Sequence, residues 1–182
     1  DVFPIAWRNL IGFARQSKYL VASDGLRRLC EMHLPYRELT EARLPVHVVA
    51  TDMLSGGTVV LSKGSVVDAV MASTAIPAAF APVRIGGRYL VDGAITSNTP
   101  INVAAAQGAR RLIVLPTGYA CALDHPPQGV VASALHALTL LIARQLLAEL
   151  RELDAGIEYR IVPPLCPLER SPYDFAHTGE LI

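Results

Sequence analysis

The segment LPVHVVATD, residues 44–52, constrains the fold more than any other part of the sequence. It is almost continuously apolar and rich in β-branched side chains, which is typical of a strand buried on both faces of a sheet. A second segment of this kind, RLIVL at residues 111–115, follows a helical pattern over residues 98–108. Because strands that alternate with helices favour parallel pairing, we expect an α/β fold with a mostly parallel central sheet flanked by helices.

Turn and capping residues divide the rest of the chain into short elements. Ser65 and Asp68 have the spacing of a capping box at the start of a helix, and Gly86-Gly87 is a two-residue turn of hairpin type. The tail, residues 163–182, is Pro-rich and predicted to be irregular. The patterns predict further strands over residues 58–64, 83–85, 88–91 and 158–162, and helices over residues 6–20, 26–34, 65–75 and 129–153.

Composition excludes several classes of protein. The 16 basic and 16 acidic residues give a net charge of zero, so no basic surface for nucleic acid is expected. With 52% hydrophobic and 18% charged residues, the chain is not intrinsically disordered. Its longest apolar run ends at Arg144, short of the roughly 20 residues that a spanning helix needs. The three widely spaced cysteines (Cys30, Cys121 and Cys166) and the lack of a signal-peptide pattern predict free thiols and a cytoplasmic location.

The sequence holds one conspicuous acid and no motif for a bound cofactor. It contains no GxGxxG or GxxxxGK[ST] loop, no His or Cys pair at metal-ligand spacing, and no GxSxG serine elbow. The acid is Asp92, which ends a predicted strand and is followed by Gly93 and Ala94. Functional sites of α/β folds lie at such strand ends, but the spacing alone favours a turn aspartate that bonds its own backbone two residues on.

Three specific pieces of sequence follow one another along the chain: ASTAIPAAFAPV at residues 72–83, LVDGA at residues 90–94 and NTP at residues 98–100. With these pieces in the expected order, residues 45–115 resemble the carboxyl-side half of a patatin-like phospholipase domain. The tail SPYDFAHTGELI is also similar to the segment that closes such domains. The resemblance implies a lipid acyl hydrolase that acts on a phospholipid, a lysophospholipid or a simpler carboxylic ester and that needs no metal or organic cofactor.

The resemblance also implies which residues act. In that family a serine in GxSxG and an aspartate in DG[GA] form a catalytic dyad, and Asp92, Gly93 and Ala94 match the aspartate motif. The GxSxG serine and the glycine-rich oxyanion loop would lie upstream of Asp1. We therefore expect residues 1–182 to be the carboxyl-side portion of a single patatin-like domain, inactive without its N-terminal portion. The alternative is a non-catalytic lipid- or protein-binding module on the same scaffold.

Other polar residues have simpler interpretations. Asp52 ends the first buried strand and is expected to bond its own turn, although it could face the same cleft as Asp92. Asn98 is expected to cap the helix that follows it. His47 and His136 lie in apolar patterns without ligand spacing, which favours hydrogen-bonded core histidines.

Two segments bear on the surroundings of Asp92 and on membranes. By the resemblance, the small residues Ser73 and Thr74, just before Ala75-Ile76-Pro77, let a helix end pack near the site.

The helix over residues 129–153 is apolar nearly all round in its first half, which predicts burial in a core. Peripheral contact with a membrane is the alternative.

Overall fold

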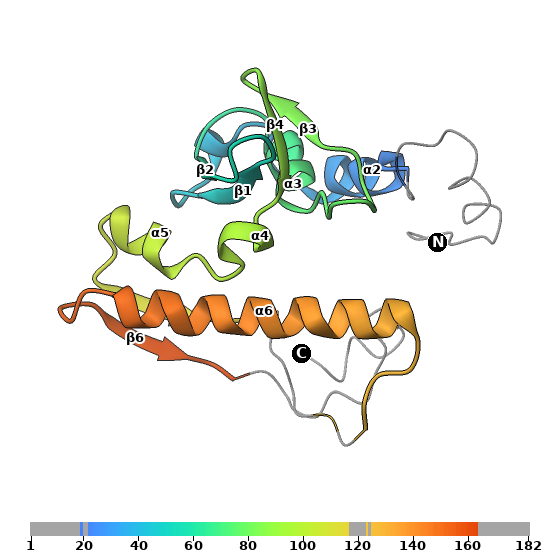
Figure 1. Cartoon of the computed structure of the whole chain (residues 1–182). Helices are drawn as coiled ribbons and strands as arrows, with labels where there is room; N and C mark the ends of the chain where they lie inside the picture. Colours follow the sequence, from blue (N-terminus) through green and yellow to red (C-terminus); the bar gives the residue numbers. More distant parts are fainter. Residues whose placement is uncertain (1–18, 20–21, 117–122, 124, 164–182) are drawn as a thin grey trace.

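The structure, a computed structural model, describes residues 19, 22–116, 123 and 125–163. The expected helix over residues 6–20 and the tail after residue 163 lie almost wholly outside this part. Figure 1 shows the arrangement of the elements. In chain order they are α2 (Asp24–His33), the 3₁₀ turn η1 (Leu39–Glu41), β1 (Val48–Asp52), β2 (Thr58–Leu61), α3 (Val66–Ser73), β3 (Val83–Ile85), β4 (Arg88–Asp92), α4 (Ala94–Ser97), α5 (Ile101–Ala106), β5 (Arg111–Val114), α6 (Val130–Glu152) and β6 (Glu158–Ile161).

The four strands near Asp92 form an antiparallel sheet in the order β2-β1-β4-β3. Residues 53–57 join β1 to β2, and Gly86-Gly87, both at positive φ, close the β3–β4 hairpin as expected. Such connections are too short for a parallel crossover. Among the described strands parallel pairing is limited to β5 and β6. The helices and strands are consistent with the expected α/β class. The expectation of a mostly parallel central sheet is wrong for the described strands.

The central strand β1 is buried on both faces. Val49, Ala50 and Thr51 are buried in succession, as the apolar sequence predicts, although the strand begins at Val48 rather than at residue 44. Ala50 packs against Ala72 of α3 and Leu90 of β4 in one core cluster. The small side chains of Ala50 and Ala72 let α3 approach the sheet closely, which brings the end of α3 to the end of β4.

The helix α3 begins at the predicted cap. The Ser65 hydroxyl accepts the backbone N–H of Asp68 at 3.2 Å. The Asp68 carboxylate contributes a different contact, a 2.8 Å salt bridge to Arg27 of α2. Both side chains are about two-fifths exposed, so this pair adds only ~0–1 kcal/mol. Its main consequence is that α2 is joined to α3.

The long helix α6 lies alongside α4 and α5, with β6 on its other side (Figure 1). Its second half is amphipathic: Leu146 and Leu150 pack with Ile101 of α5 and with the buried side of β5. Its first half extends past these elements, and Leu140 and Leu141 are 47% and 63% exposed. The expected burial of the first half is therefore wrong for the described residues, because most of their side chains in this part of the helix are exposed.

Candidate functional site

Asp92 is the last residue of β4, where three elements meet. It lies opposite Ala50 of β1 in the strand register. Its backbone N–H donates to the carbonyl of Ala75 at 3.0 Å, and the N–H of Gly93 donates to the carbonyl of Ser73 at 3.4 Å. The end of α3 thus holds the backbone on both sides of the Asp92 α-carbon. Small residues at the helix end do pack beside this acid, as the resemblance implies.

The carboxylate of Asp92 is half-buried and hydrogen-bonded once to its own turn. Oδ1 accepts the backbone N–H of Ala94 at 2.8 Å, which is the bond expected of a turn aspartate. Burial nevertheless raises the pKa of Asp92, because removal from water disfavours the charged form, and the Ala94 bond opposes this shift only in part. A partly buried carboxylate whose proton affinity is raised is suited to act as a base.

The raised pKa gives a testable pH dependence of stability. Between the ordinary pKa of aspartate, about 3.9, and the higher pKa of Asp92, the folded state binds more protons than the unfolded state. The contribution of Asp92 to the free energy of unfolding is therefore fully present below the ordinary pKa of aspartate. It is lost as the pH rises through the raised pKa of Asp92. In urea denaturation, the stability of the wild type relative to Asp92→Asn should fall from pH 3 to pH 7. A difference that rises with pH would mean that the ionised carboxylate stabilises the fold, as in a purely structural turn.

Gly93 is required for a reason other than turn geometry. Its backbone is ordinary right-handed helical, at φ −64° and ψ −24°, which any residue can adopt. A Cβ at this position would instead lie 2.9 Å from the carbonyl carbon of Val49 and closer still to its oxygen. Gly93 is therefore required by packing, because β1 passes directly against this residue.

Thr51 is part of the site, although its sequence context did not indicate it. Its side chain is 2% exposed. The hydroxyl donates to the Asp92 carbonyl at 2.9 Å and shares a 3.0 Å hydrogen bond with the hydroxyl of Thr96 in α4. Within the apolar run VVAT a threonine indicates only a strand, because β-branched residues are common in strands. Its hydroxyl in fact links β1 both to the end of β4 and to the helix after it.

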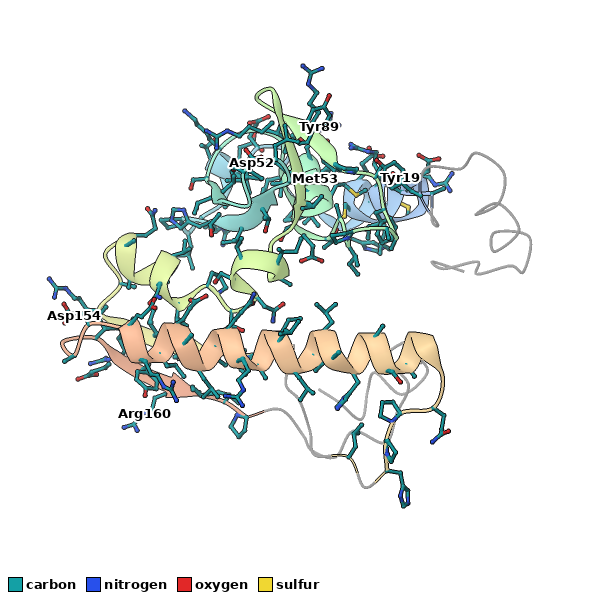
Figure 2. All side chains as sticks on the ribbon, viewed as in Figure 1. Tyr19, Asp52, Met53, Tyr89, Asp154 and Arg160 are labelled. Atoms are coloured by element: carbon teal, nitrogen blue, oxygen red, sulfur yellow. The ribbon has the colours of Figure 1, made fainter. Side chains whose placement is uncertain are left out.

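Asp52 does not join Asp92. It lies opposite Leu90, at the other end of the paired segment, near Tyr89 (Figure 2). Its Oδ1 accepts the backbone N–H groups of Leu54 at 2.9 Å and of Ser55 at 3.3 Å. The predicted turn role is confirmed, and the hydrogen bonds of this carboxylate go to its own turn and not to Asp92.

The remaining polar candidates stay outside the site or differ from expectation. Asn98 does not cap the following helix, since α5 is preceded by Pro100 and no side chain caps it. His47 precedes β1 and is partly exposed, and its Nδ1 shares a 2.7 Å hydrogen bond with the Ser62 hydroxyl, so it is bonded but not a core residue. His136 is partly exposed on α6. Within the described ranges no group of three or more His, Cys, Asp or Glu side chains is placed to hold a metal ion.

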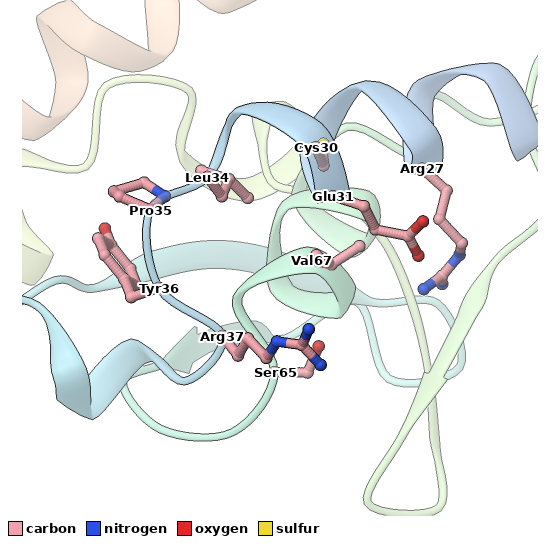
Figure 3. A pocket seen from close by; sticks show the side chains of 9 residues that line it. All are labelled: Arg27, Cys30, Glu31, Leu34, Pro35, Tyr36, Arg37, Ser65 and Val67. Carbon is pink, nitrogen blue, oxygen red and sulfur yellow. The ribbon is translucent and has the colours of Figure 1, made fainter.

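The pocket drawn in Figure 3 lies away from Asp92. It has a volume of about 530 Å³ and opens between α2 and the start of α3. Charged side chains on its wall include Arg27 and Glu31, with Cys30 close by, and Arg27 is already paired with Asp68. Asp92 is not among its lining residues, so this pocket is not the place for chemistry at that carboxylate.

Comparison with known proteins gives a family match and several partial relatives. The model of the patatin-like phospholipase family matches residues 15–105, half of the chain, and this span includes α3, Asp92, Gly93 and Ala94. An uncharacterized NTE family protein of Mycobacterium tuberculosis is 43% identical over 58 residues, which are 32% of this chain and 10% of that protein. A second from the same organism is 39% identical over 66 residues, 36% of this chain and 18% of that protein, and Mycobacterium bovis has relatives with the same values. The chain spans only a small part of the length of these relatives.

Proposed function

The chain belongs to the patatin-like phospholipase family, and we propose that it is the carboxyl-side portion of a lipid acyl hydrolase in which Asp92 is the base of a Ser-Asp dyad. The observation that carries this proposal is the Asp92 carboxylate itself. It is half-buried, and burial raises its pKa. Its backbone is held at a strand end by hydrogen bonds that Asp92 and Gly93 donate to carbonyls at the end of α3. The serine would come from the N-terminal portion of the same domain. That portion is the partner that the proposal requires.

The proposed chemistry is acyl transfer in two steps. Asp92 accepts the proton of the serine hydroxyl while the serine oxygen attacks the ester carbonyl, and the proton then passes to the departing alcohol. In the second step Asp92 takes a proton from the water that attacks the acyl-serine, and this proton passes to the serine oxygen as the bond to the acyl group breaks and the carboxylic acid leaves. The oxyanion would be held by backbone N–H groups of a glycine-rich loop upstream. The substrate would be a phospholipid, a lysophospholipid or a simpler carboxylic ester.

The second candidate function is a non-catalytic lipid- or protein-binding module. The observation that favours it is the Ala94–Asp92 bond, which a structural turn also makes. One experiment separates the two functions: determine the intact mass of the protein as expressed from its gene, then treat it with a fluorophosphonate serine probe. A mass above 19.5 kDa with one labelled serine supports the hydrolase. A mass above 19.5 kDa without a labelled serine overturns the hydrolase proposal and supports the binding module.

Helix α6 supports a proposal of peripheral contact with the surface of a membrane on the cytoplasmic side. By length and hydropathy its segment Ala132–Glu152 passes the test for a spanning helix, a test that core helices of soluble proteins also pass. Leu140 and Leu141 are exposed, and the cation of Arg144 follows them. Exposed leucines beside a cation are typical of helices that lie in the interface of anionic lipids.

We expect Leu140→Glu combined with Leu141→Glu to weaken binding to phosphatidylcholine–phosphatidylglycerol vesicles by about tenfold, since two leucines no longer enter the apolar layer. Vesicle co-sedimentation measures this. Met32→Glu is the matched control, because Met32 is also an exposed apolar side chain, 71% accessible, but on α2. Equal binding by the wild type and the double variant, with both folded, would contradict contact through α6.

A further inference from the structure

Two side chains of α6 bind the short helix that follows Asp92. Gln145 Nε2 donates to the carbonyl of Ile95 at 2.7 Å. One turn further along α6, Glu149 accepts the hydroxyl of Ser97 through Oε1 and the backbone N–H of Asn102, at 3.2 Å, through Oε2. Gln145 and Glu149 are four residues apart and therefore lie on one face of the helix. We call this set of three hydrogen bonds the α6 clamp.

The helix α4 needs such support. It has four residues, too few to be stable through its own hydrogen bonds. Ser97, which the clamp holds, is 6% exposed. On the opposite side, Thr96 is bonded to Thr51 of β1. Three successive residues of α4 are thus held from two elements that are distant in the sequence.

The clamp retains polar groups where apolar packing would be simpler. Within the described part of the chain, the buried polar side-chain atoms that lack a hydrogen-bond partner are Asn98 Nδ2 and Gln145 Oε1. Gln145 belongs to the clamp, and Asn98 is the residue directly after α4. Unsatisfied buried polar atoms are rare and unfavourable, so this junction is not arranged for stability alone.

We propose that Gln145 and Glu149 are positioning residues for Asp92, which act by fixing α4. The inference rests on the proposed function of Asp92. The path is short: α4 begins one residue after Gly93, and its first N–H, that of Ala94, is the donor that orients the Asp92 carboxylate. Release of α4 from α6 should therefore leave the carboxylate free to rotate towards solvent, while β1 and β4 remain paired.

The test is amide hydrogen exchange, read by NMR, in the chain itself. In Gln145→Ala, a variant that changes no charge, exchange of the Ala94, Thr96 and Ser97 amides should accelerate by about fivefold for the lost hydrogen bond. Amides of β1 should exchange at the wild-type rate. Ser97→Ala, which removes the bond to Glu149 without changing charge, should give the same pattern.

A matched control and a second readout make the test decisive. Leu141→Ala, on the exposed part of the same helix, should change none of these rates. Unchanged α4 rates in both clamp variants, or acceleration spread equally over β1, would overturn the proposal, since the second pattern indicates a general loss of stability. In a protein that includes the proposed N-terminal portion, Gln145→Ala should lower kcat and leave KM unchanged. Faster α4 exchange with an unchanged kcat would mean that α4 does not position Asp92 for catalysis and would overturn the proposal. The role of Asp92 as the base is tested separately, by Asp92→Asn.

Discussion

In a protein that includes the proposed N-terminal portion, Asp92→Asn should reduce ester hydrolysis by about 10²–10⁴-fold without loss of folded structure. The asparagine Oδ1 can still accept the N–H of Ala94, because that bond uses an oxygen that both side chains have. What the amide cannot do is take the serine proton. The rate should therefore fall through kcat on a short-chain p-nitrophenyl ester, while the urea midpoint at pH 7 stays at or above the wild-type value.

The matched control is Asp52→Asn. Asp52 ends the neighbouring strand and binds two N–H groups of its own turn, but it lies at the other end of the β1–β4 pairing. Its substitution should change kcat by less than about twofold, since a turn bond contributes to stability only. Retention of most activity by Asp92→Asn, or an equal loss in Asp52→Asn, would remove Asp92 from the proposed mechanism.

Local chemistry made several elements predictable from the sequence. The Ser65 cap, the Gly86-Gly87 turn and the burial of the strand before Asp52 each depend on residues within a few positions, and each is found in the structure. The antiparallel pairing of β1 and β2 was not predicted, although Ser55-Gly56-Gly57 is a short Gly-containing connection of the kind that joins hairpins. The expectation of a mostly parallel sheet rested on the alternation of strands and helices along the whole chain.

The supports of Asp92 were not predictable in this way. Thr51, Gln145 and Glu149 reach the site from positions 41 or more residues away in sequence. Their residue types are ordinary for a strand or for the surface of a helix. Their roles follow from which elements pack together, and a pattern of residue types along one chain does not contain that information.

Gly93→Ala should destabilise the fold itself, by about 1–3 kcal/mol as for other insertions into packed positions. The added Cβ would meet the backbone of Val49, 2.9 Å from its carbonyl carbon, and not the mobile end of a side chain. Val49 cannot withdraw easily, because β1 is hydrogen-bonded on one side to β2 and on the other to β4. The free energy of unfolding from urea denaturation measures the effect.

Gly25→Ala is the control for this substitution. No atom lies within 4 Å of a Cβ at Gly25, which is in the helix α2, so alanine there should be neutral or stabilising by up to about 1 kcal/mol. A Gly93→Ala protein as stable as the wild type would contradict the close approach of β1 to Gly93. Asp92→Asn and Gly93→Ala should therefore give different results at adjacent residues. The first should lower activity without lowering stability, and the second should lower stability. In this pair of residues, Asp92 would then accept the proton, and Gly93 would lack a side chain so that β1 can pack against its backbone.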